Sequence, residues 1–107
     1  MKYRVVITDT AKQDLREIGI WIAEQSKNKE LAKKFIGNLH TEIKKLATFP
    51  NAGALPKDRI LRSAGFRYVV HKDYLMFYTV DEERDVVNVM AVFNAKKDYI
   101  HVMRHFI

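Results

Sequence analysis

Cysteine is absent from this chain of 107 residues, which also has only two prolines and four glycines. The missing cysteine excludes disulfides and thiolate-based zinc sites, a pattern typical of proteins in a reducing compartment. No hydrophobic run approaches the length of a membrane span, and Met1-Lys2-Tyr3 leads into an alternating pattern instead of an apolar signal segment. We therefore expect a cytoplasmic protein that is not inserted in a membrane.

Hydrophobic residues, in contrast, make up 48% of the chain and aromatic residues 11%. This composition favours a globular fold over disorder. The length is near the commonest size of a domain and is sufficient for one hydrophobic core. We expect residues 1–107 to form a single domain.

The charge is unevenly distributed along the chain. Nineteen Lys and Arg residues against thirteen Asp and Glu residues give a net charge of +6. Residues 65–107 carry six basic and six acidic residues, so the whole excess lies in residues 1–64. A basic chain favours nucleic acid or an acidic protein segment as its partner. Lysines on helices often only solvate a helix face, so Arg59 and Arg62, outside any strong helical pattern, are better functional candidates.

Hydrophobic periodicity predicts a strand followed by two helices in the first half of the chain. Residues 3–7 alternate as a short strand, and Thr8-Asp9-Thr10 supplies oxygens that cap a first helix. A break at 26–28 starts the second helix, which Phe49-Pro50 and the following residues terminate. The short connection predicts an antiparallel αα-hairpin. The apolar stripes are Ala11, Leu15, Ile18 and Ile22, then Ala32, Phe35, Ile36, Leu39, Ile43 and Leu46.

The second half predicts three strands and a short helix. Two β-runs between residues 65 and 80 are joined by a three-residue turn, a third covers 86–93, and residues 98–106 form a C-terminal helix. Residues 53–64 are expected to form a long irregular loop, a kind that is often functional. The expected class is α+β: a twisted, mainly antiparallel four-stranded sheet with the N-terminal αα-hairpin on one face, in the order β-α-α-β-β-β-α.

Four pieces of the sequence form a specific pattern through their combination and spacing: Leu46–Gly53, Gly65-Phe66-Arg67, Tyr74–Val80 and Val89–Tyr99. With these pieces in this order, the chain resembles the RelE/ParE family of toxins from bacterial type II toxin–antitoxin, or plasmid stabilisation, modules. The resemblance covers essentially the whole chain.

The resemblance implies a toxin that arrests growth and is neutralised by a cognate antitoxin, with which it can form a hetero-oligomer. RelE-like members cleave mRNA in the ribosomal A site, whereas ParE-like members inhibit DNA gyrase. No cofactor is implied for either activity. If the chain is an enzyme, the resemblance implies a metal-independent endoribonuclease. A third possibility is a binding module on the same fold that has lost toxicity.

Cleavage of RNA by its own 2′-hydroxyl requires a base, an acid and cations that stabilise the phosphorane. RelE-like toxins typically carry an arginine after the tyrosine of the second meander strand, and the matching residue here is Leu75. This departure and the long helical hairpin favour the ParE-like reading. The RelE-like alternative remains open, with Arg67 and Lys97 as phosphate clamps and His71 or His101 as acid or base.

A basic surface around the meander is the expected contact with the target, whether protein or RNA. His101 and His105 have the i, i+4 spacing of metal ligands, but no third ligand lies nearby in sequence, so we expect no metal site. We expect the antitoxin to pair with an open sheet edge and to lay an amphipathic helix on the hairpin. The candidate contact residues are Arg59, Arg62, Arg67, Lys72, Lys96, Lys97 and Arg104.

Overall fold

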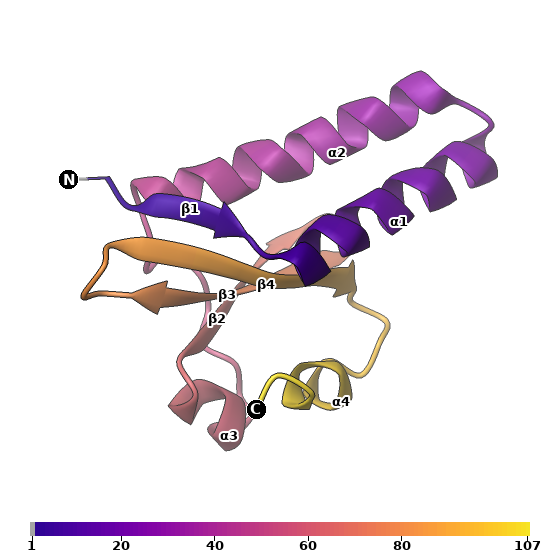
Figure 1. Ribbon diagram of the computed structural model, residues 1–107. Coiled ribbons are helices and arrows are strands. Elements are labelled where there is room, and N and C mark those ends of the chain that lie inside the picture. Colours follow the sequence, from indigo (N-terminus) through magenta and orange to yellow (C-terminus); the bar gives the residue numbers. More distant parts are fainter. Residues whose placement is uncertain (1) are drawn as a thin grey trace.

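One four-stranded sheet lies between two helical layers in the computed structural model, which describes residues 2–107 (Figure 1). The strand order is β1-β4-β3-β2, with β1 parallel to β4 and the other neighbours antiparallel. The expected class and element order are confirmed. The elements are β1 (Arg4–Ile7), α1 (Asp9–Ser26), α2 (Lys29–Lys44), η1 (Lys45–Ala47), α3 (Arg59–Ser63), β2 (Phe66–His71), β3 (Tyr74–Asp81), β4 (Val86–Asn94) and α4 (Tyr99–Arg104).

The helical hairpin begins and turns where the sequence predicts. Thr8 caps α1, because its Oγ1 accepts a hydrogen bond from the Ala11 amide at 3.3 Å. Lys27 then adopts the left-handed conformation with φ 54°, which ends α1. Asn28 caps α2 by accepting a hydrogen bond from the Leu31 amide at 3.1 Å. Because only two residues separate the helices, α1 and α2 pack antiparallel.

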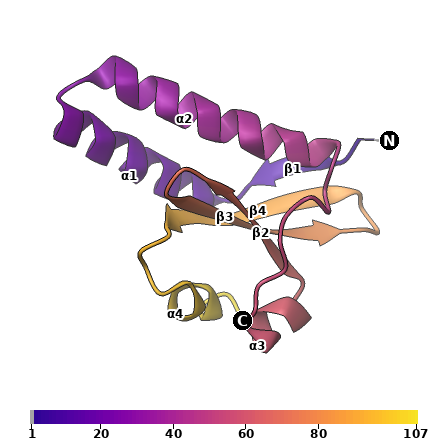
Figure 2. The same cartoon turned by 180° about the vertical axis from the view of Figure 1, so that it is seen from behind.

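Two hydrophobic cores lie on opposite faces of the sheet. The first core joins the hairpin to the sheet, and the predicted stripes of both helices contribute to it. The second core lies on the opposite face of the sheet. This is the face on which α3 and α4 are placed (Figure 2). In this second core, the ring of Phe77 stacks between Phe93, at a centroid distance of 5.6 Å, and Tyr99, at 5.8 Å. The apolar side predicted for the C-terminal helix, which includes Tyr99, faces this core.

Local details differ from the sequence-based expectations. Residues 53–64 were expected to be irregular, but Arg59–Ser63 forms α3, which Asp58 caps by accepting from the Leu61 amide at 3.1 Å. The turn between β2 and β3 has two residues, Lys72 and Asp73, instead of three, because His71 still pairs with Tyr74. None of the helices formed by residues 2–107 is both long and apolar enough to cross a bilayer.

Candidate functional site

Arg67 and Tyr78 together hold the loop that leads to α3. Arg67 lies near the start of β2, and its Nη1 donates to the carbonyl oxygens of Gly53 at 3.0 Å and Asn51 at 3.3 Å. The Tyr78 hydroxyl donates to the Pro50 carbonyl at 2.7 Å and accepts from the Gly53 amide at 2.9 Å. Burial raises the pKa of Tyr78 against the opposing effects of the Gly53 amide and the Arg67 charge. The guanidinium of Arg67 therefore supports the backbone.

The strand registers separate Arg67 from Lys96 and Lys97. Arg67 pairs with Tyr78 and hence lies level with Val89, whereas Lys96 and Lys97 follow the end of β4 at Asn94. Five residues of strand correspond to roughly 16 Å. The predicted phosphate clamps are thus brought to different parts of the sheet.

His71 lies under α2 rather than on an open surface. Its ring centroid is 5.8 Å from that of Phe35 in an edge-on arrangement. Its Nε2 is buried and has no hydrogen-bond partner within residues 2–107. Lys72, the next residue, is exposed in the turn. A buried nitrogen of this kind is poorly placed to exchange a proton with a bound RNA.

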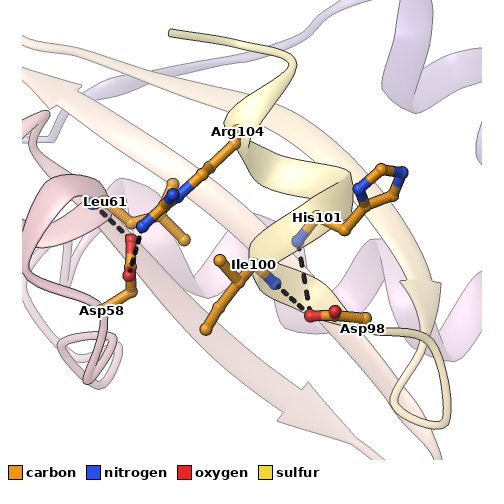
Figure 3. Close-up of polar contacts among 6 residues, drawn as sticks. All are labelled: Asp58, Leu61, Asp98, Ile100, His101 and Arg104. Atoms are coloured by element: carbon orange, nitrogen blue, oxygen red, sulfur yellow. Dashed lines mark hydrogen bonds and ion pairs between the residues drawn. The ribbon is translucent and has the colours of Figure 1, made fainter.

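The capping carboxylate Asp58 connects α3 to α4. Arg104 of α4 donates from Nη2 to Asp58 Oδ1 at 3.0 Å (Figure 3). Desolvation raises the pKa of Asp58, but the hydrogen bonds from the Leu61 amide and Arg104 outweigh it and leave the pKa below its ordinary value. The His101 ring points away from this pair in Figure 3. Arg104 is therefore engaged within the molecule.

Arg59 and Arg62 behave differently from Arg104. Both are exposed on α3, and in the described chain, 2–107, neither forms an ion pair.

His101 is also exposed, and its ring packs against that of His105 at a centroid distance of 5.1 Å. Residues 2–107 contain no cluster of three or more acidic or histidine side chains that could hold a metal ion.

A groove of about 730 Å³ runs along the hairpin between α1 and α2. Its floor is made of small and aliphatic residues, and the charged residues along it are all basic. Gly37 adds to its width, since a Cβ at this position would have no heavy atom within 4 Å. The apolar lining is Leu15, Gly19, Ile20, Ala23, Ala32, Ile36 and Gly37, and the basic lining is Lys12, Arg16, Lys29 and Lys33, with His40.

A second cleft, of about 480 Å³, lies between α1, the end of β4 and α4. In it, Asp14 Oδ2 accepts a hydrogen bond from the Val92 amide at 2.9 Å, where β4 extends beyond its partner β1. Burial raises the pKa of Asp14, the Val92 hydrogen bond opposes this, and of the nearby charges Glu17 raises the pKa whereas Lys97 lowers it. Lys97 is thus close enough to influence a carboxylate of α1.

The family model for the ParE toxin of the type II toxin–antitoxin system parDE matches residues 5–99. This chain belongs to the ParE toxin family. It is therefore a type II toxin by family, as the resemblance of its four sequence pieces implied. No curated protein matches the chain at a significant level.

Solved structures share the fold of this ParE-family chain. The chromosomal ParDE system of P. aeruginosa matches with a TM-score of 0.72 and 15% identity, over 87% of this chain and 96% of that one. The RelBE2 toxin–antitoxin complex of Mycobacterium tuberculosis matches with a TM-score of 0.61 and 19% identity, over 88% of this chain and 99% of that one. A double arginine-to-alanine mutant of free E. coli RelE matches with a TM-score of 0.61 and 19% identity, over 95% of this chain and 93% of that one. ParE and RelE thus share this fold.

Sequence reasoning missed two features of this ParE-family chain. One is Asp14, which lies on the same face of α1 as the buried residues Ala11, Leu15 and Ile18. A lone carboxylate on an apolar helix face was the available signal. The other is the hairpin groove, whose signals were Gly19 and Gly37 inside otherwise regular helical patterns.

Proposed function

We propose that this toxin arrests growth as a ParE-like inhibitor of DNA gyrase and that a cognate antitoxin neutralises it. The observation that carries the choice of target is the separation of the groups an RNA-cleaving site needs. Arg67 binds loop carbonyls, the Nε2 of His71 is buried beside Phe35, and Lys97 lies near Asp14. Of the two histidines considered as acid or base, His101 on α4 is the exposed one. The general base must reach the attacking 2′-hydroxyl, the general acid the leaving 5′-oxygen, and the cations the phosphate between them, so all must converge on one RNA linkage.

The corresponding experiment compares two activities of the purified protein. We expect it to inhibit DNA supercoiling by gyrase, while primer extension after brief induction detects no new mRNA ends. Cut mRNA with unaffected supercoiling would instead establish the RelE-like endoribonuclease. Absence of growth arrest on induction would identify a non-toxic binding module on the toxin fold.

We further propose that the antitoxin lays an acidic amphipathic helix in the hairpin groove. Two of the similar structures are toxin–antitoxin systems, which supports a protein partner of this kind. The groove offers apolar surface bounded by the cations Lys12 and Arg16 on α1 and Lys29 and Lys33 on α2. This combination complements a helix with an apolar face and acidic flanks. Gyrase and antitoxin would meet the toxin in the cytoplasm, where we place it.

Charge reversal tests the groove. Lys29→Glu combined with Lys33→Glu should weaken binding of the antitoxin encoded beside the toxin by at least tenfold and reduce its salt dependence. Lys44→Glu combined with Lys45→Glu is the matched control, since these residues lie outside the groove lining. Equal losses from both pairs would show a general charge effect and contradict the proposed groove.

A further inference from the structure

The loop between η1 and α3, residues 48–58, is held firmly against the sheet although it has little regular structure. The Ala54 amide donates to the Tyr68 carbonyl at 2.8 Å, and the Tyr68 amide donates to the Ala54 carbonyl at 3.0 Å. Gly53 is buried, and a Cβ there would lie 2.6 Å from the Tyr78 hydroxyl oxygen. Together with the hydrogen bonds of Arg67 and Tyr78, these contacts fix the path of the loop.

This loop and α3 nevertheless display large apolar side chains to solvent. Phe49 is 64% exposed, Leu55 51% and Ile60 47%. Their exposure is not explained by a loosely attached segment, because Pro56, directly after Leu55, and Leu61, directly after Ile60, are buried. Apolar side chains that face water from a backbone already held in place suit an interaction surface, since binding then costs little ordering of the loop.

The charges of the same segment are almost all positive. Lys57, Arg59 and Arg62 are exposed, and across residues 2–107 none of them forms an ion pair. The single acidic residue, Asp58, is already engaged by the Leu61 amide and by Arg104 (Figure 3). The segment therefore presents cations and apolar groups together, and its own carboxylate does not neutralise the cations.

We propose that residues 49–62 form a preformed docking surface for an acidic protein, and that the toxin holds its target through this surface. Two of its three exposed apolar side chains, Leu55 and Ile60, are aliphatic, and Phe49 is the single aromatic ring on which a base could stack. Because recognition of RNA bases relies on several stacking faces, this composition favours a protein over RNA. The surface includes α3, which lies on the other side of the sheet from the hairpin helices α1 and α2 (Figure 1). Target and antitoxin would thus use different surfaces. The inference rests on the proposed function, in that the target is a protein.

Binding of purified DNA gyrase holoenzyme to the full-length toxin tests this surface. We expect Leu55→Asp and Arg59→Glu each to weaken binding at least tenfold. The matched controls are on the hairpin: Leu31→Asp, at a side chain that is 49% exposed, and Lys34→Glu, and both should bind within twofold of the wild type. All four variants should keep the far-ultraviolet circular dichroism of the wild type and its antitoxin binding.

The outcomes separate this inference from the proposed function. If the wild type binds gyrase and the loop variants bind equally well, the docking surface is wrong. If the wild type arrests growth without binding gyrase, the choice of gyrase is wrong, and the same variants are then compared for growth arrest. Loss of arrest in Leu55→Asp and Arg59→Glu alone would support the surface, and retained arrest would overturn it. Loss of an mRNA-cleaving activity in these variants would overturn the protein class of the target.

Discussion

At the scale of single residues, polar side chains on apolar faces have the clearest structural roles in this chain. Asp14 accepts the Val92 amide, Tyr78 bridges two loop backbone groups, and His71 packs against Phe35. Such residues could be recognised in the sequence as exceptions to the pattern. Their partners could not be recognised in this way. Asp14 and Tyr78 contact backbone groups that are far away in the chain, whereas sequence periodicity reports only local structure.

Asp14 should stabilise the protein through its acceptor oxygen. Asp14→Ala leaves the Val92 amide without this partner at the end of β4, and we expect a loss of about 1–3 kcal/mol in the free energy of unfolding. Asp14→Asn retains an acceptor and should change the free energy of unfolding by less than about 0.5 kcal/mol. Urea unfolding followed by circular dichroism distinguishes them, and equal losses would assign the effect to charge.

His71 should be dispensable for toxicity. Its Nε2 makes no hydrogen bond within residues 2–107, so His71→Leu removes no such bond and keeps the contact with Phe35 apolar. We expect full growth arrest and a free energy of unfolding within about 1 kcal/mol of the wild type. A variant that is folded but harmless would restore His71 as a catalytic candidate.

Tyr3 should titrate at unusually high pH. Its hydroxyl donates a hydrogen bond to the Glu82 carboxylate, which raises the pKa of Tyr3 to about 12. The folded form therefore holds this proton more tightly than the unfolded chain does. The resulting stabilisation is present below the ordinary tyrosine pKa of 10.0 and is lost as the pH rises through about 12. Tyr3→Phe should remove this component from the tyrosinate absorbance titration, and an unchanged curve would contradict it.

At the scale of elements, the long helices were predictable and α3 was not. Each hairpin helix has a long apolar stripe and a capping side chain, Thr8 or Asn28, so its start and buried face follow from the sequence. Helix α3 has only five residues, too few to show a period. Its capping residue Asp58 was the available signal, but the ion pair that joins α3 to α4 links Asp58 to Arg104, 46 residues away in the chain.

Gly37 should reduce the stability of α2. Glycine inside a helix is less favourable than alanine, and a Cβ at Gly37 would meet no heavy atom within 4 Å. We expect Gly37→Ala to raise the free energy of unfolding by about 0.5–1 kcal/mol. Gly19→Ala is the control, because its Cβ would lie only 3.3 Å from Ile36 Cγ1. This close contact should offset the gain in helix stability. Equal effects of the two substitutions would contradict the packing described between the helices.

At the scale of the whole molecule, strand order and site geometry were the least predictable properties. The sequence predicted four strands in a mainly antiparallel sheet, but it did not identify the parallel partner of β1. That partner is β4, in which Val86 aligns with Arg4 although the two residues are 82 positions apart in the chain. The antiparallel registers of β2, β3 and β4 place Arg67 and Lys97 apart. Two arginines that look equivalent in the sequence therefore have different roles: Arg67 donates hydrogen bonds to the loop backbone, whereas Arg59 is exposed to solvent.

The single tryptophan of the chain gives the molecule a built-in spectroscopic reporter. Trp21 is 55% exposed at the cleft that also contains Asp14, so water already surrounds much of its indole in the folded state. Unfolding should consequently shift its fluorescence only slightly. A protein that covers the cleft would remove that water and move the emission to shorter wavelength. Tryptophan fluorescence of this toxin should therefore follow the arrival of a partner on α1 far better than it follows the loss of the fold.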